Sequence, residues 1–199
     1  MKSIIFDLNG VFIKGEYLTS RLEKKYKVST EESLTALKSI MDIVRQPNAP
    51  SIYSLCESYF EEWGVELDET EFLDWYFSGE SLDEEMYEFA LSLKQQGYNI
   101  YFLSNNFRER TDYYRNNLPK LFQLPKKSYF SWETGLVKPN VEVYKHILNE
   151  NSLDPTSTYY IDDSEKNLEV AGSLGVNTFL MKNETTVDDL REFIASASV

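Results

Sequence analysis

Residues 3–10 of the chain read SIIFDLNG, a short apolar run that stops at Asp7 and is followed closely by Gly10. The pattern predicts a buried β-strand that leads into a tight loop, because buried parallel strands are nearly continuous apolar runs and glycine favours turns. Asp7 is therefore expected at the carboxyl end of the first strand of a sheet.

Strands and helices alternate after Gly97. Further strand-like runs lie at residues 99–103, 128–132, 158–161 and 177–181. Helical patterns lie between and after them, at about 108–122, 141–151, 168–174 and 187–194. This alternation is typical of an α/β fold with a Rossmann-like, doubly wound parallel sheet and helices on both faces.

The stretch from about residue 16 to residue 96 indicates helices only. Helical spacing is clearest in an apolar stripe made of Ile52, Leu55, Cys56, Tyr59, Phe60 and Trp63. Three pairs have the spacing of a capping box at a helix start, namely Ser29 with Glu32, Asp68 with Glu71, and Ser81 with Glu84. We therefore predict an all-helical domain at 15–80, inserted into a core domain formed by 1–14 and 81–199.

Composition narrows the class of protein. The 199 residues carry a formal net charge of −13, which argues against nucleic acid and anionic membranes as partners. The single cysteine, Cys56, excludes an intramolecular disulfide and fits a reducing compartment, and we expect it in the core. The apolar run before Asp7 is too short for a signal peptide. We expect a cytoplasmic monomer or homodimer that binds a small molecule.

Polar residues stand where three of the predicted strands end. These are Asp7, the pair Ser104-Asn105 and the pair Asp162-Asp163. Ligands of open α/β sheets bind beyond the carboxyl ends of the strands. The sequence therefore predicts that these side chains meet at one edge of the sheet and form a site there. The single histidine, His146, leaves no basis for a Ser-His-Asp triad or a zinc cluster.

Four segments, in this order, carry a resemblance to a known family: residues 6–11 (FDLNGV), 102–105 (FLSN), 135–139 (GLVKP) and 161–164 (IDDS). Each is weak alone, but together they span nearly the whole chain. The sequence resembles the haloacid dehalogenase-like hydrolases, and in particular their sugar-phosphate phosphatases. The predicted helical insert is similar to the helical cap of that family.

The resemblance implies that Asp7 is a nucleophile that forms an aspartyl phosphate. A carboxylate suits this role because a covalent intermediate divides one difficult displacement into two easier ones. Lys138 is implied as a catalytic residue that neutralises the phosphoryl charge, and Ser104 and Asn105 are implied, with Lys138, to bind the substrate. The expected substrate is a small phosphorylated metabolite.

The resemblance also implies a Mg2+ cofactor, because hard cations prefer oxygen ligands. Its expected ligands are Asp7, Asp163 and the backbone carbonyl of Asn9, with Asp162 in a supporting role.

Asn9 departs from the family pattern, which usually has a second aspartate there as the general acid and base. An amide cannot exchange protons in that way, and general acid–base catalysis typically contributes about 10²–10⁴-fold. Four interpretations stay open. The protein is a phosphatase for good leaving groups such as acyl phosphates or sugar 1-phosphates, a 2-haloacid dehalogenase, a non-catalytic phosphometabolite-binding protein, or a chain in which Asn9 was engineered.

Overall fold

The computed structural model describes residues 2–196. At its centre is a parallel sheet of five strands in the order β5-β4-β1-β6-β7. The strands are β1 (Ser3–Phe6), β4 (Asn99–Ser104), β5 (Lys127–Phe130), β6 (Thr158–Asp162) and β7 (Asn177–Leu180). The predicted Rossmann-like α/β fold is confirmed.

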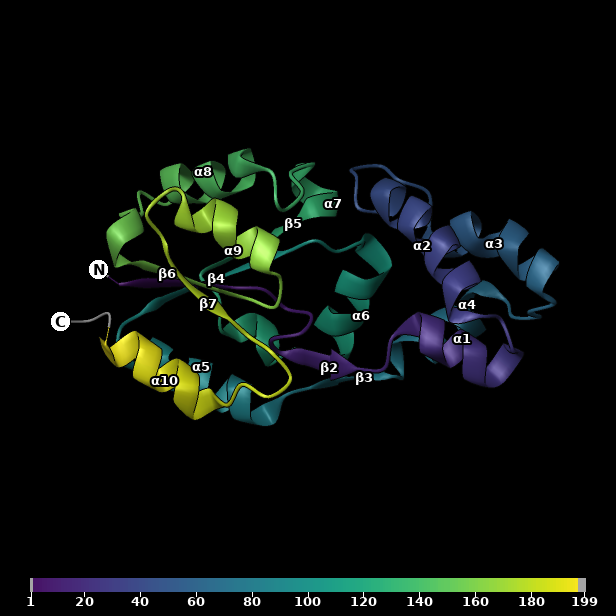
Figure 1. Ribbon diagram of the computed structural model, residues 1–199, viewed down its shortest axis with the longest axis horizontal. Coiled ribbons are helices and arrows are strands. Elements are labelled where there is room, and N and C mark those ends of the chain that lie inside the picture. Colours follow the sequence, from purple (N-terminus) through teal and green to yellow (C-terminus); the bar gives the residue numbers. More distant parts are fainter. Residues whose placement is uncertain (1, 197–199) are drawn as a thin grey trace.

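Helices cover both faces of this sheet (Figure 1). One face packs against α8 (Val141–Glu150) and α9 (Glu165–Gly172). The other face packs against α5 (Glu84–Gln95), α6 (Arg108–Asn117) and α10 (Val187–Ser196). Short connecting turns are α7 (Ser131–Thr134) and the 3₁₀ segments η1 (Leu121–Gln123) and η2 (Pro155–Ser157).

The register of the central strands determines which residues lie together at the carboxyl edge of the sheet. Strand β1 is buried along its whole length, and Phe6 pairs with Phe102 of β4 on one side and with Ile161 of β6 on the other. Three strands therefore end at nearly the same height. The residues that follow them, such as Asp7 directly after β1, meet at one edge of the sheet.

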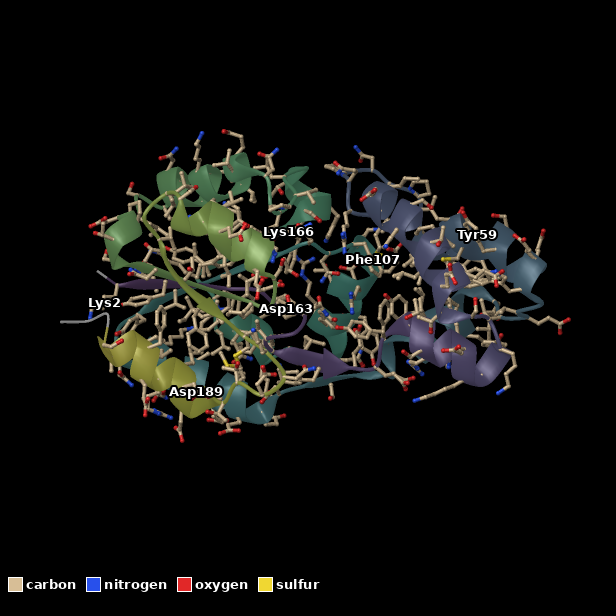
Figure 2. All side chains as sticks on the ribbon, viewed as in Figure 1. Lys2, Tyr59, Phe107, Asp163, Lys166 and Asp189 are labelled. Carbon is tan, nitrogen blue, oxygen red and sulfur yellow. The ribbon has the colours of Figure 1, made fainter. Side chains whose placement is uncertain are left out.

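Four helices form a separate layer at one end of the molecule (Figure 1). They are α1 (Leu18–Tyr26), α2 (Thr30–Val44), α3 (Ile52–Trp63) and α4 (Glu69–Phe77). They pack around their own hydrophobic cluster, which contains Cys56 and is joined by Phe107 of the sheet domain (Figure 2). Cys56 is only 1% exposed, so its predicted place in the core is confirmed.

A two-stranded antiparallel ribbon connects the helical layer to the sheet domain. Its strands are β2 (Ile13–Gly15) and β3 (Glu80–Leu82), and Gly15 pairs with Glu80. The sequence predicted only helices over this stretch, and that prediction was wrong for β3. Strands of three residues show too little alternation to be recognised, and these two are stabilised by pairing across more than sixty residues of chain.

The capping predictions had mixed outcomes. Asp68 and Glu71 form the reciprocal capping box at the start of α4. Ser29 caps α2 by accepting a hydrogen bond from the backbone of Glu32. The third prediction was wrong, because Ser81 lies in β3 and the cap of α5 is Asp83.

No helix within residues 2–196 combines the length and apolar character needed to cross a membrane.

Candidate active site

Asp7 lies at the end of β1 and is almost fully buried, at 7% exposure. The backbone N–H of Leu8 donates a hydrogen bond of 2.7 Å to its Oδ1. Burial raises the pKa of Asp7 from 3.8 to about 6; Lys138 opposes this rise, and the neighbouring Asp162 and Asp163 add to it. The folded protein therefore holds a carboxylate in a place where its charge is costly, as is common in active sites.

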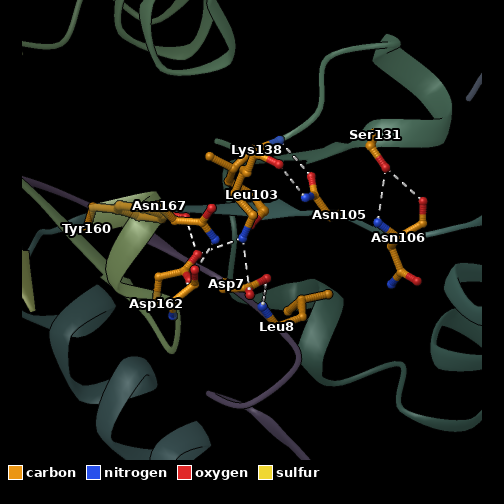
Figure 3. A network of polar contacts seen from close by, with 11 residues as sticks. Asp7, Leu8, Leu103, Asn105, Asn106, Ser131, Lys138, Tyr160, Asp162 and Asn167 are labelled. Atoms are coloured by element: carbon orange, nitrogen blue, oxygen red, sulfur yellow. Dashed lines mark hydrogen bonds and ion pairs between the residues drawn. The ribbon is translucent and has the colours of Figure 1, made fainter. Parts of the chain in front are cut away.

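Lys138 supplies the positive charge next to Asp7 (Figure 3). Its Nζ lies 3.1 Å from Asp7 Oδ2 and 2.7 Å from Asp162 Oδ2, and donates to the carbonyl of Leu103 at 3.1 Å. Burial alone would lower the pKa of Lys138, but the two carboxylates outweigh it and raise the pKa. The ammonium group is thus charged and fixed in place.

Asn105 holds the backbone of Lys138 from the end of β4. Its Nδ2 donates to the Lys138 carbonyl and its Oδ1 accepts from the Lys138 N–H, both at 2.8 Å. The next residue is fixed as well, because the Ser131 hydroxyl accepts from the Asn106 N–H and donates to the Asn106 carbonyl (Figure 3). Both polar atoms of the Asn105 carboxamide are thus hydrogen-bonded to the backbone of Lys138.

Asp162 is completely buried, and both its oxygens are occupied. Oδ1 accepts from the backbone of Ser164 at 2.8 Å and from Asn167 at 2.9 Å. Oδ2 accepts from Lys138 and from the hydroxyl of Tyr160. The sequence reasoning missed Tyr160, although its position two residues before Asp162 places both on the same face of β6. Asp162 is saturated and serves to hold Lys138.

Asp163 differs from its neighbour because it is exposed. Oxygens of Asp7, Asp162 and Asp163 lie within 4.8 Å of one another. The loop after β1 allows this approach through Gly10, whose φ is +84° and where a Cβ would collide with the Asp163 carboxylate. Since Asp162 is saturated, Asp7 and Asp163 are the pair with oxygens left for a cation, and this all-oxygen donor set fits magnesium.

Asn9 and Ser104 complete the site. Asn9 Nδ2 donates to the hydroxyl of Tyr114 at 2.8 Å, and its buried Oδ1 has no hydrogen-bond partner within residues 2–196. Ser104 is the last residue of β4 and is buried. The structure thus brings all the predicted site residues to one sheet edge.

Comparisons with known proteins agree with this fold. A chain from Bacteroides thetaiotaomicron, a HAD family enzyme, superposes with a TM-score of 0.82 at 24% identity, over 96% of this chain and 98% of that one. The same enzyme has been solved with magnesium and inorganic phosphate. D-ribitol-5-phosphate phosphatase of that organism is 23% identical over 92% of this chain and 93% of its own length.

A porcine relative is longer. Bifunctional epoxide hydrolase 2 of Sus scrofa is 24% identical over 96% of this chain, which spans only 38% of the length of that relative. The family model for haloacid dehalogenase-like hydrolases matches residues 1–175. The chain therefore belongs to the haloacid dehalogenase-like hydrolase family.

Proposed function

We propose that the protein is a magnesium-dependent phosphatase that acts on a small phosphorylated metabolite through an aspartyl phosphate on Asp7. The observation that carries this proposal is the fixed contact between Lys138 and Asp7 at the sheet edge. A carboxylate with a buried ammonium beside it combines a nucleophile with a group that neutralises phosphoryl oxygens. The phosphatase relative supports a small phosphorylated metabolite as the substrate class.

In the first step, an Asp7 oxygen bonds to phosphorus while the bond from phosphorus to the leaving oxygen breaks. In the second step, water attacks the phosphorus of the aspartyl phosphate and releases inorganic phosphate and free Asp7. Lys138 neutralises the charge of the phosphoryl oxygens in both steps, and the Ser104 hydroxyl is available to donate a hydrogen bond to one of them. Asn105 acts by holding Lys138 in position.

Asp7, Asp163 and the backbone carbonyl of Asn9 would hold the magnesium ion. When bound, it supplies positive charge that offsets the phosphoryl charge. The need for such charge follows from the residues, since three carboxylates share this edge with Lys138. We further propose that helices α1–α4, within residues 15–80, form a cap that covers the substrate and excludes water during the first step.

Asn9 narrows the proposal to substrates whose leaving group needs little protonation. A non-catalytic binding protein is the second candidate, because Asn9 removes the usual proton donor while the contact between Lys138 and Asp7 remains. Turnover separates the two candidates, since both would bind phosphate and magnesium.

The test is magnesium-dependent hydrolysis of p-nitrophenyl phosphate by the wild type and by Asp7→Asn. Asp188→Asn is the matched control, because Asp188 has an 85% exposed side chain on α10. We expect activity in the wild type and the control, and none in Asp7→Asn or after chelation. An inactive wild type that still binds magnesium and phosphate would favour the binding protein, and activity on 2-haloacids instead would favour a dehalogenase.

A further inference from the structure

Asn9 belongs to a polar network that joins the loop after β1 to helix α6 and strand β3. The Tyr114 hydroxyl accepts from Asn9 Nδ2 at 2.8 Å and donates to Glu80 Oε2 at 2.7 Å. Arg110 Nε donates to the same hydroxyl at 2.8 Å, and the Arg110 guanidinium forms an ion pair with Glu80. Tyr114 is fully buried, and the side chains of Glu80 and Arg110 are only 7% and 18% exposed.

The donor and acceptor capacity of the Tyr114 hydroxyl determines which residue fits at position 9. A hydroxyl has one proton to donate and two lone pairs that accept. Ionised Glu80 can only accept and Arg110 can only donate, so the proton goes to Glu80 and one lone pair is filled by Arg110. The remaining lone pair needs a donor. An asparagine side chain provides one, whereas an ionised aspartate does not.

The same reasoning fixes the orientation of the Asn9 carboxamide. Its NH2 group must face Tyr114, so its Oδ1 faces elsewhere, and this oxygen is buried without a partner within residues 2–196. A buried amide oxygen without a partner is unfavourable until a donor arrives. Water or a substrate hydroxyl is such a donor.

We propose that position 9 is built for an amide, and that Tyr114, Glu80 and Arg110 are positioning residues that hold Asn9 Oδ1 ready to accept a hydrogen bond from the leaving group or the attacking water. This inference deepens the proposed phosphatase function and rests on it for its catalytic part. Asn9 orients the bound group without taking its proton. The substrates that fit are therefore acyl phosphates and phosphates on an anomeric carbon, whose leaving groups depart without strong acid catalysis.

Variants that place a carboxylate at position 9 and an amide at position 80 test the network without any need for turnover. Thermal unfolding of the metal-free protein at about pH 8, where carboxyl groups are ionised, is compared for wild type, Asn9→Asp, Glu80→Gln and the double variant. We expect Asn9→Asp to lower Tm by at least about 4 °C, because the new carboxylate meets a lone pair of Tyr114. The double variant should recover most of this loss, since the tyrosine proton can turn to position 9.

Repeating these four unfolding measurements, a double-mutant cycle, in a Tyr114→Phe background shows whether the Tyr114 hydroxyl is responsible for the recovery. We expect the recovery to disappear there. Recovery of equal size without the hydroxyl would mean simple charge repulsion and would overturn the proposal. So would an Asn9→Asp protein as stable as the wild type.

The kinetic arm uses p-nitrophenyl phosphate with Tyr114→Phe and its neighbour control Tyr113→Phe. Tyr113 is the neighbouring tyrosine of α6 and is partly buried, but it is not part of the network around Asn9. We expect kcat to fall about 10-fold in Tyr114→Phe with KM nearly unchanged, and neither to change in the control. An unchanged kcat in Tyr114→Phe would refute the positioning role. If the wild type shows no turnover, the phosphatase proposal fails, and the unfolding cycle still decides whether position 9 requires an amide.

Discussion

Asp7→Asn is expected to stabilise the metal-free protein. The structure raises the pKa of Asp7 from 3.8 to about 6, chiefly by burial. At pH 8 the ionised carboxylate is therefore less favourable in the folded state than in the unfolded chain, and about two pKa units correspond to about 3 kcal/mol. The amide has nearly the same shape and no charge. Lys138 keeps its partner Asp162 in the variant, so no buried cation is left unpaired.

The sign of the pH dependence follows from the raised pKa. Well below pH 4 the carboxyl group is protonated in both states, so the wild type and Asp7→Asn should be about equally stable. The wild type loses stability relative to the variant as pH rises from about 4 to about 6, and the full difference is present at pH 8. For a chain of this size, about 3 kcal/mol corresponds to a Tm difference of about 6–12 °C.

Differential scanning calorimetry from about pH 4 to pH 8 with a chelator present measures this difference directly. Added magnesium should raise Tm of the wild type and leave that of Asp7→Asn nearly unchanged, because the variant has lost a ligand. A variant that is less stable than the wild type at pH 8 without metal would show that ionised Asp7 stabilises the fold and that its burial is not costly.

Three further predictions concern single side chains. Lys138→Met should lower the free energy of unfolding by about 3–5 kcal/mol, because it leaves the buried Asp162 without its cation; denaturant titration measures this, and a loss below about 1 kcal/mol would contradict it. Asp163→Asn should reduce the Tm increase caused by magnesium while changing metal-free stability little, and an unchanged magnesium effect would exclude Asp163 as a ligand. Cys56 should react with a thiol reagent only after unfolding, since burial raises the pKa of its thiol to about 12; rapid labelling of the native protein would show that α1–α4 open readily.

Residues that follow buried strands were predictable from the sequence. Asp7, Ser104 and Asp163 each stand at or just past the point where an apolar run stops, and parallel strands end at a common edge. Local pattern is sufficient there because burial and strand direction are both visible in the order of residues. Lys138 follows no strand, and only the resemblance to the family singled it out.

The groups that hold the site in place were not predictable. Tyr160 looks like any strand residue, and Glu80 lies in a three-residue strand that the helical pattern around it conceals. Tyr114 and Arg110 read as ordinary positions of an amphipathic helix. Their roles depend on which elements pack together, and hydrophobic periodicity specifies buried faces without specifying the partners across them.

The role of Asn9 was also not predictable from the sequence alone. The sequence reveals that an amide replaces the usual acid, and it leaves open whether the site lost a group or was built around an amide. The three partners of the Tyr114 hydroxyl favour the second interpretation, because only a donor at position 9 completes them.

The aspartyl phosphate on Asp7 is best tested by pre-steady-state hydrolysis of p-nitrophenyl phosphate, with acid quenching and mass spectrometry of the peptide that contains Asp7. p-Nitrophenolate leaves without protonation, whereas the attack of water on the aspartyl phosphate lacks a general base because residue 9 is Asn. We expect a burst of about one p-nitrophenolate per protein and a phosphoryl group on Asp7 during the slow phase. Turnover without a burst and without phosphorylated Asp7 would contradict an aspartyl intermediate at this site.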